Sequence, residues 1–400
     1  MRALDGITVL DLTHMLSGPY GAMILTDLGA RTIKVEPPGS GEGTRALLAT
    51  SPDFARDGMG AYFLTLNRGK QSVALDLKQE AGREVFYDLV RQADVVIDNF
   101  SVGVTRRLGI DHDTLAAINP RIVTCSISGF GETGPDPLRP AFDQVVQAMG
   151  GGMSITGFAD QAPVRSGIPH GDLGGGIFGA IGVLAALTAR ETTGVGRHVD
   201  VSMLDVQVSM LNYMATMFLL SGEVPERMGN AHFVHVPYNS FKTSTNYIII
   251  ACIGDAFFEK FAELLGRSEL RDPKYLKQPV RFADKDYIES IINEELVKHD
   301  ADYWLGRLRT ARIPCGPVND LSQALSDPQV RARNMVVDVQ LPSGSVVAMP
   351  GNPVKISGCD DPAQPNPPPR LGEHSEAVLS DLLKYPVERI AALRKAGIVQ

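Results

Sequence analysis

The sequence contains little cysteine and no closely spaced metal-binding residues. Its four cysteines, Cys125, Cys252, Cys315 and Cys359, are far apart among 400 residues, with no CxxC pair or Cys/His ligand spacing. A disulfide framework or a zinc site needs closer and more regular spacing. The cysteines therefore indicate reduced thiols in a cytoplasmic protein, and we predict no metal site.

A signal peptide and a membrane-spanning segment are also missing from the sequence pattern. The first residues, MRALDGITVLDLT, run directly into a strand pattern, so no signal peptide is expected. The longest apolar segment, 201–220, contains Asp205, Gln207 and Asn212, whose side chains would be costly in lipid. We expect one long helix here that is buried in protein.

An excess of positive charge is lacking as well. The net charge of −8 at pH 7 argues against broad binding of nucleic acid or anionic membranes. It does not argue against a local basic pocket for a phosphorylated ligand. With 44% hydrophobic and 21% charged residues, the chain has the composition of a well-packed globular protein, and its length indicates two domains or one domain with a large insertion.

The first third of the chain alternates between strand and helix patterns. Short β-branched apolar runs indicate strands, and longer amphipathic or apolar runs between them indicate helices. Alternation of this kind predicts an α/β fold with a Rossmann-like, doubly wound parallel sheet. The predicted strands are 7–12, 31–35, 71–75, 95–97 and 121–126, and the predicted helices are 18–28 and 80–92.

The second half of the chain has a different pattern. Residues 222–334 combine one clear strand, 247–253, with amphipathic helices, which predicts a smaller α+β domain. The strands 336–341 and 345–349 flank Pro-Ser-Gly and predict a hairpin. Residues 361–370 are rich in proline and predict an extended linker.

The first turn of the predicted Rossmann-like unit does not have the dinucleotide-binding fingerprint. That fingerprint needs G-x-G-x-x-G, so that the backbone can approach a pyrophosphate. Here the turn reads LSGPYG, and the glycines that follow at 39–43 come after a different strand. The pattern argues against an NAD-dependent enzyme.

The segment HGDLGGG places Asp172 just ahead of three consecutive glycines, with Leu173 between them, and an apolar helix pattern follows. One interpretation is structural, in which Asp172 is an N-cap that accepts hydrogen bonds from the first helical amides. The other is functional: the glycines let a substrate approach the carboxylate, the helix N-terminus keeps it ionised, and amides stabilise an oxyanion. The local sequence leaves both interpretations open.

A cluster of basic residues also has two interpretations. Arg68 and Lys70 lie in the segment NRGK, Lys78 follows, and Arg106 and Arg107 come later. These side chains could form a solvated face, or they could bind the phosphates of a nucleotide-like ligand.

Taken together, these segments resemble one known family. The whole chain resembles the class III CoA-transferases of the CaiB/BaiF type, a group that includes formyl-CoA transferase, carnitine CoA-transferase and the α-methylacyl-CoA racemases. The order and spacing of the matching stretches carry the resemblance. They are VLDLTHMLSGPYGAMILTDLGARTIKVEPPGSGE, LNRGKQSVALDLK, ADVVIDNFSVGVTRRLGI, ISGFGETGP, HGDLGGG, RHVDVSMLD, IPCGPVNDL and LGEHSEAVL.

The resemblance implies an enzyme that transfers CoA between carboxylic acids, with Asp172 as the nucleophile. Its carboxylate would form an aspartyl–acyl anhydride and then an aspartyl-CoA thioester. The resemblance also implies that CoA or acyl-CoA is a substrate and that no cofactor is bound permanently. The residues that it places near the CoA nucleotide are Glu36, Arg68, Lys70, Asn99, Phe100 and Arg107.

The resemblance further implies an interlocked homodimer and a division of the chain into four stretches. Residues 1–200 would form the Rossmann-like CoA-binding domain, and 201–221 a linker helix. Residues 222–334 would form the small α+β domain, and 335–400 a return segment whose C-terminal helices complete the large domain.

Two departures from relatives narrow the expected chemistry. Leu16 stands where formyl-CoA transferase has glutamine, and no glycine run follows Ile253, which argues against formyl-CoA and oxalate as substrates. Phe142 stands where the racemases have a proton-transferring histidine, and a phenyl ring cannot accept a proton. Asp143 then remains as a second carboxylate at the catalytic site.

The expected reaction moves CoA from succinyl-CoA or a similar donor to a small dicarboxylic or hydroxy acid. Arg45, His235 and Tyr238 are candidate contacts for a second substrate carboxylate. An α-methylacyl-CoA racemase is the alternative activity, and a non-catalytic acyl-CoA-binding protein is a third possibility.

Overall fold

The computed structural model describes residues 1–361 and 364–400, and the chain forms two compact units within it. Unit 1 comprises 1–152, 165–222 and 328–400, and unit 2 comprises 153–164 and 223–327. The segment 153–164 thus joins the small unit although it lies within the range 1–200 that was expected for the large domain. Residues 362 and 363 of the predicted proline-rich linker lie outside the described residues.

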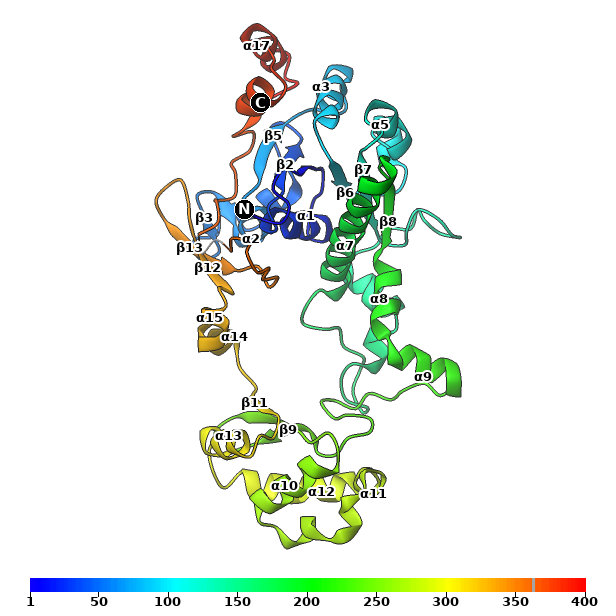
Figure 1. Cartoon of the computed structure of the whole chain (residues 1–400), viewed down its shortest axis with the longest axis vertical. Coiled ribbons are helices and arrows are strands. Elements are labelled where there is room, and N and C mark those ends of the chain that lie inside the picture. The colour runs from blue at the N-terminus through cyan, green and yellow to red at the C-terminus, as the bar shows by residue number, and fades with distance from the viewer. Residues whose placement is uncertain (362–363) are drawn as a thin grey trace. The chain divides into compact units, whose positions relative to one another are not determined.

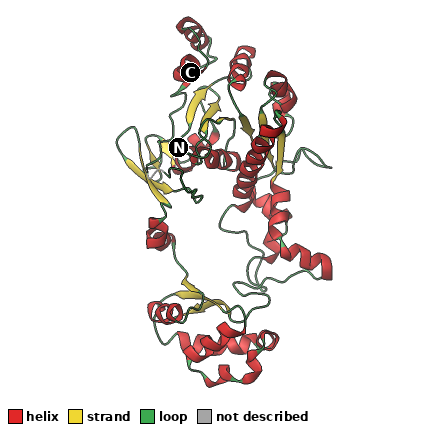
Figure 2. Ribbon diagram, viewed as in Figure 1, coloured by secondary structure: helices red, strands yellow, loops and turns green. Residues whose placement is uncertain are grey.

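Unit 1 is built on a six-stranded sheet in which every pair of neighbouring strands is parallel (Figures 1 and 2). In the order β5-β2-β1-β6-β7-β8, the chain adds strands on one side of β1 first and then, from β6 onward, on the other side. This is the doubly wound arrangement expected from the alternating pattern. The strands are β1 (Thr8–Asp11), β2 (Arg31–Glu36), β5 (Gln71–Ala74), β6 (Val95–Asp98), β7 (Val123–Ser128) and β8 (His198–Ser202).

Alternate residues of these strands enter different cores on the two faces of the sheet. Leu10 and Val96 pack with the helices α3 (Glu80–Arg91) and α5 (His112–Ile118), whereas Val9 and Val95 lie in the core that includes residues of α1 and α7. Because strand side chains alternate in direction, a sheet covered on both faces needs apolar residues at nearly every position. That requirement explains the short, continuous apolar runs in the sequence.

Two helices, α1 (Ser17–Asp27) and α7 (His170–Thr193), cross on one face of the sheet at glycines. A Cβ on Gly176 would lie 2.5 Å from the carbonyl oxygen of Ser17, and one on Gly21 would lie 2.8 Å from that of Gly176. A side chain at either position would force the helices apart, because protein interiors are close-packed. The glycines therefore set the depth of α7 against α1.

The segment 201–220 differs from the single buried helix that was expected. It forms α8 (Met203–Leu211) and α9 (Tyr213–Ser221), which meet at 72°. Asn212 at the break has φ of 49° and ψ of −120°, far from helical values, so one helix cannot continue through it. No residue of α9 is buried in this chain.

Helix α7 is long and apolar enough to cross a membrane by length and composition, and so is the bent pair α8–α9. Core helices of globular proteins pass the same test. One face of α7 packs on α1, β7 and α8, while Ile177, Phe178 and Ile181 on another face are exposed. In the single chain, α7 is therefore buried on one face and exposes apolar side chains on another.

Unit 2 has a three-stranded antiparallel sheet in the order β11-β10-β9, covered by helices around a core that includes Phe258 and Trp304. The strands are β9 (Tyr238–Lys242), β10 (Tyr247–Ala251) and β11 (Cys315–Pro317). The helices of this unit are α10 (Asp255–Leu265), η3 (Ser268–Arg271), η4 (Pro273–Leu276), α11 (Gln278–Ala283), α12 (Lys285–Leu296), α13 (Ala301–Thr310) and α14 (Leu321–Ser326).

The last part of the chain returns to unit 1. The predicted hairpin is confirmed as β12 (Val336–Gln340) and β13 (Val346–Pro350), whose apolar side chains pack on α2 (Ala61–Asn67). After the hairpin come three short elements: α16 (Ser375–Ala377), the π-helical turn η5 (Val378–Leu382) and α17 (Val387–Lys395). Residues of this C-terminal region pack in the core that contains Leu10 and Val96. The remaining elements of unit 1 are η1 (Gly43–Arg45), β3 (Ala55–Arg56), β4 (Met59–Gly60), α4 (Val104–Leu108), α6 (Asp143–Met149) and α15 (Pro328–Ala332), and η2 (Gly152–Ile155) begins where the chain passes to unit 2.

Candidate active site

Asp172 lies in the first turn of α7 and does not cap the helix. The helix begins at His170, the capping position is Pro169, and no side chain caps the helix from that position. Among the described residues, no hydrogen bond to the half-buried carboxylate of Asp172 is found. The N-cap interpretation of this aspartate was therefore wrong, and its carboxylate is left free for other chemistry.

Asp143 provides the interactions that a capping residue would have made. It is the first residue of α6 and is only 9% exposed. Its Oδ1 atom accepts hydrogen bonds from the backbone amides of Gly171, at 2.8 Å, and Asp172, at 3.4 Å. Its Oδ2 atom accepts from Nε2 of Gln147 at 2.7 Å. Both carboxylate oxygens of Asp143 are thus engaged.

The two carboxylates influence each other electrostatically. Burial and the negative charge of Asp143 raise the pKa of Asp172 to about 6. The carboxylate of Asp172 is therefore easier to protonate than the helix N-terminus alone would suggest. The amides of Gly171 and Asp172 donate to Asp143, so they are not free to stabilise an oxyanion as the sequence suggested.

Tyr62 belongs to the same group, although nothing in its local sequence pointed to the site. It is the second residue of α2, and its pKa is raised by burial, by Asp172 and by Asp143. The segment AYFLTLN reads as an apolar helix, in which a tyrosine is an ordinary core residue. Only the packing of the helices brings its hydroxyl near the two carboxylates.

The glycines after Asp172 serve helix packing. A Cβ on Gly174 would lie 2.7 Å from Cγ1 of Val206, and one on Gly175 would lie 3.1 Å from Ile127 and Met203. A Cβ on Gly171 would lie 2.5 Å from Cγ2 of Val146 and 3.0 Å from Oδ1 of Asp143. The glycine run therefore allows close contact within the protein, and nothing in these contacts requires a substrate.

A cavity of about 520 Å³ lies beyond the carboxyl ends of the parallel strands, near the point where the sheet order reverses. Glu36, Phe100 and Arg107 line it, together with Lys78 from the basic cluster. Open α/β sheets bind ligands in this position. Three of the six residues expected near CoA are thus brought together here.

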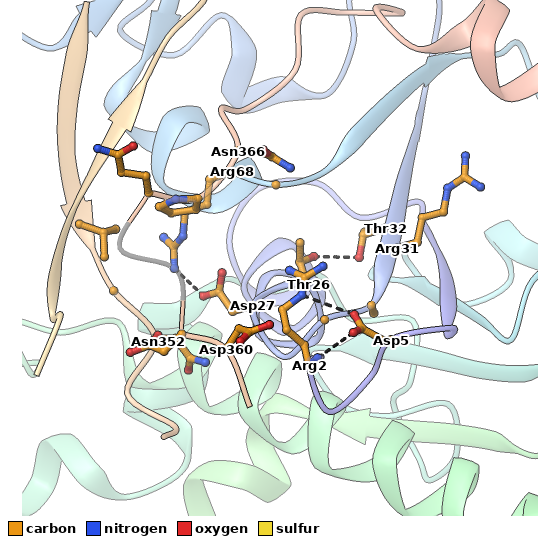
Figure 3. Close-up of a pocket in the computed structure, with 18 of the residues that line it drawn as sticks. Arg2, Asp5, Thr26, Asp27, Arg31, Thr32, Arg68, Asn352, Asp360 and Asn366 are labelled. Carbon is orange, nitrogen blue, oxygen red and sulfur yellow. Dashed lines mark hydrogen bonds and ion pairs between the residues drawn. The ribbon is translucent and has the colours of Figure 1, made fainter. Parts of the chain in front are cut away.

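Arg68 and Lys70 lie elsewhere. Arg68 is buried and forms an ion pair with Asp27 at 2.5 Å (Figure 3). It lines a polar cavity of about 630 Å³, which Arg31 and Gln71, the first residues of β2 and β5, also line. Lys70 is buried and pairs with Asp11 at 2.8 Å. Burial lowers the pKa of Lys70 to about 8, although Asp11 opposes this effect.

Two polar residues near the 520 Å³ cavity have protein partners. Asn99 accepts a hydrogen bond from the amide of His14 and donates to its carbonyl, which fixes the loop after β1. Glu36 forms a bidentate ion pair with Arg45 and also accepts from Ser72. Arg45 is therefore occupied by Glu36, while His235 and Tyr238 belong to unit 2.

Comparison with known proteins assigns this arrangement to a family. Residues 4–375 match the model of CoA-transferase family III. This chain belongs to CoA-transferase family III. The chain is 44% identical over 376 residues to acetyl-CoA:oxalate CoA-transferase of Acetobacter aceti, with 94% of each chain covered. It is 37% identical over 386 residues to succinate–glutarate CoA-transferase of Agrobacterium fabrum, with 95% of each covered.

A solved structure agrees with this assignment. The CaiB/BaiF family protein of Brucella suis superimposes with a TM-score of 0.85 at 37% identity, covering 95% of this chain and 99% of that one. The protein is therefore a CoA-transferase, and CoA thioesters are its substrates. Among residues 1–361 and 364–400, no group of three or more His, Cys, Asp or Glu side chains could hold a metal ion.

The placement of the lysines in this CoA-transferase predicts different effects on stability. In Lys70→Met, Asp11 would lose its 2.8 Å ion-pair partner while remaining buried, and Lys34, 3.7 Å away, would be its remaining cation beside the hydrogen bonds from Thr13. Removing one member of a buried ion pair costs about 3–5 kcal/mol. Urea denaturation followed by circular dichroism should show a loss of this size. Lys78→Met, at an exposed position, should change the free energy of unfolding by less than about 0.5 kcal/mol. Equal effects of the two substitutions would contradict this placement.

Proposed function

We propose that this protein transfers CoA from an acyl-CoA donor to a small carboxylic acid through covalent intermediates on Asp172. The observation that carries the proposal is the contrast between two neighbouring carboxylates. Both oxygens of Asp143 accept hydrogen bonds from N–H groups, whereas no described residue donates a hydrogen bond to the Asp172 carboxylate. A nucleophile needs an oxygen that is free to attack, and Asp172 has it.

The proposed reaction splits one exchange into four attacks. An oxygen of Asp172 attacks the donor thioester carbon, the C–S bond breaks, and a mixed anhydride and CoA thiolate result. The thiolate attacks the aspartyl carbon, which releases the donor acid and leaves an aspartyl-CoA thioester. The acceptor carboxylate attacks the same carbon and expels the thiolate, which then attacks the acceptor acyl carbon and frees Asp172. Each intermediate stays activated, so no external energy source is needed.

For CoA itself, the 520 Å³ cavity is the proposed nucleotide site. Lys78 and Arg107 line it and can meet phosphate oxygens, and Phe100 offers an aromatic surface. Glu36 and Asn99 would act there by holding Arg45 and the loop after β1 in place. Arg68 and Lys70 remain predicted CoA contacts, but their buried ion pairs favour a structural role.

Dicarboxylic acids are the proposed acceptors. The relatives at 44% and 37% identity are named for oxalate and for succinate and glutarate. Leu16 argued against oxalate as a substrate. Because the relative at 44% identity is named for oxalate, oxalate must be included among the acceptor acids that are tested. Succinyl-CoA and acetyl-CoA are the donors to be tested first.

The proposed nucleophile is tested with the protein, a panel of acyl-CoAs and acids, and mass spectrometry of new CoA esters. Asp172→Asn should lower turnover at least about a thousandfold in every productive pair. With an ¹⁸O-labelled acceptor acid, one ¹⁸O should remain on the peptide that contains Asp172. Wild-type turnover in Asp172→Asn, or an unlabelled peptide, would contradict the mechanism. Deuterium entering Cα from solvent without an acceptor would indicate a racemase instead.

The activity should also depend on pH in a defined direction. Because Asp172 must be ionised to attack and its pKa is about 6, kcat/KM should rise with pH through a midpoint near that value. Asp143→Asn removes the charge that helps to raise this pKa, so the midpoint should move to lower pH. The pH–rate profiles of the two proteins measure the shift. An unchanged midpoint in Asp143→Asn would show that the two carboxylates are not coupled.

We further propose that the active form is an interlocked homodimer. Several large apolar side chains on α7, α8 and α9 are exposed in the single chain, and Leu220 is 83% exposed. Exposed apolar surface of this extent is typical of a protein interface. The other members of this group are Ile177, Phe178, Ile181, Val208, Met210, Tyr213, Met217, Phe218 and Leu219.

Interlocking makes a prediction that simple association does not. Light scattering should give twice the chain mass of 43.1 kDa, and that mass should persist on dilution. When tagged and untagged proteins are mixed, hybrid dimers should form only after unfolding and refolding, because interlocked chains cannot separate while folded. Hybrids that form in native buffer would rule out interlocking, and a monomer mass would rule out the dimer.

A further inference from the structure

Gln147 connects the two segments that hold the proposed nucleophile. It lies in α6, one turn after Asp143, and is only 4% exposed. Its Nε2 atom donates to Oδ2 of Asp143 at 2.7 Å, and its Oε1 atom accepts from the amide of Ser166 at 3.1 Å. The side-chain amide thus has a fixed orientation. If it were rotated by 180°, its Oε1 atom would face Oδ2 of Asp143 and its Nε2 atom would face the amide of Ser166.

Ser166 lies where the chain has just returned to unit 1, since residues 153–164 belong to unit 2. The loop that follows is short and internally bonded: Ser166 Oγ accepts from the amide of Ile168, and α7 begins at His170. Holding Ser166 therefore limits where α7 can begin. At the other end of the same amide, Asp143 holds the first-turn amides of Gly171 and Asp172.

We infer that Gln147 is a positioning residue for the transfer reaction, acting through Asp143 and Ser166 on the place of the Asp172 carboxylate. The inference rests on the proposed function, in which Asp172 attacks the thioester. Gln147 touches no reacting atom in this scheme. It keeps Asp143 turned toward α7, and it keeps the loop before α7 against α6.

Fixing Asp143 matters because the two carboxylates must play different roles. A carboxylate whose Oδ2 lost its donor could rotate and release the amides of Gly171 and Asp172. The first turn of α7 would then lose its external cap, and misplacement of a nucleophile by as little as about 1 Å can cost roughly a hundredfold in rate. Gly171 allows the close approach of Asp143, since a Cβ there would lie 3.0 Å from Oδ1.

Two substitutions separate this role from simple packing. Gln147→Met keeps the approximate volume and removes both hydrogen bonds, and kcat should fall about tenfold to a hundredfold while KM for acyl-CoA changes less than about threefold. Gln147→Glu keeps the shape but can donate to Asp143 only when protonated. Its activity relative to wild type should therefore be highest near pH 6 and fall as the pH rises, because two ionised carboxylates repel.

The same helix offers a matched control. Gln144 is exposed, so Gln144→Met and Gln144→Glu should retain wild-type kcat and the wild-type pH profile. The other titratable groups near Gln147 are Asp143, Asp172, Tyr62 and His170. They are present in every variant, so the profile of Gln144→Glu measures how far an exposed added carboxylate on the same helix shifts them.

Hydrogen exchange provides a readout that needs no substrate. In Gln147→Met, exchange at the amides of Gly171 and Asp172 should be at least about tenfold faster than in wild type and in Gln144→Met. If the wild type transfers no CoA, the proposed function fails, and the exchange rates still decide the role of Gln147. Wild-type exchange in Gln147→Met would overturn the inference. So would a wild-type pH profile in Gln147→Glu.

Discussion

The close packing of α7 against α1 and the parallel sheet is the constraint on which the site depends. Gly21 and Gly176 meet so closely that a Cβ on either would lie within 3 Å of backbone atoms of the other helix. With α7 at this depth, its first turn lies next to the start of α6, and Asp143 can reach the amides of Gly171 and Asp172. A bulkier residue at the crossing would move Asp172, the proposed nucleophile, together with the helix.

The same packing places Asp143 and Asp172 in different environments, although both are ordinary aspartates in the sequence. Asp143 is buried and hydrogen-bonded through both oxygens, so it holds backbone in place. Asp172 is half-buried, its carboxylate accepts no hydrogen bond from the described residues, and burial together with the charge of Asp143 raises its pKa to about 6. A carboxylate of this kind can lose its proton at neutral pH and is more basic than an ordinary aspartate, which suits a nucleophile that must form and release acyl bonds. Gln147, one helical turn after Asp143 in α6, donates a hydrogen bond to the Asp143 carboxylate.

Much of the fold could be predicted from local patterns because its elements satisfy local rules. Strands that are buried on both faces read as apolar runs, and the predicted strands 31–35 and 71–75 agree with β2 and β5 to within one residue. The kink at Asn212 was missed, because an asparagine inside an apolar run does not by itself indicate a break. The segment 153–164 was assigned to the wrong unit for a similar reason: unit membership depends on contacts far away in the sequence.

The sequence by itself determined the family, the parallel α/β architecture of the large unit and the choice of Asp172. These depend on motif order and periodicity, which are properties of the chain alone. The tertiary structure decided which of the basic residues can meet a ligand and which aspartate caps α7. Lys70 and Arg107 both belong to segments that match the family, but Lys70 is paired with Asp11, 59 residues away, and Arg107 lines an open cavity. Burial and pairing of a charge are set by such distant contacts, and no local pattern records them.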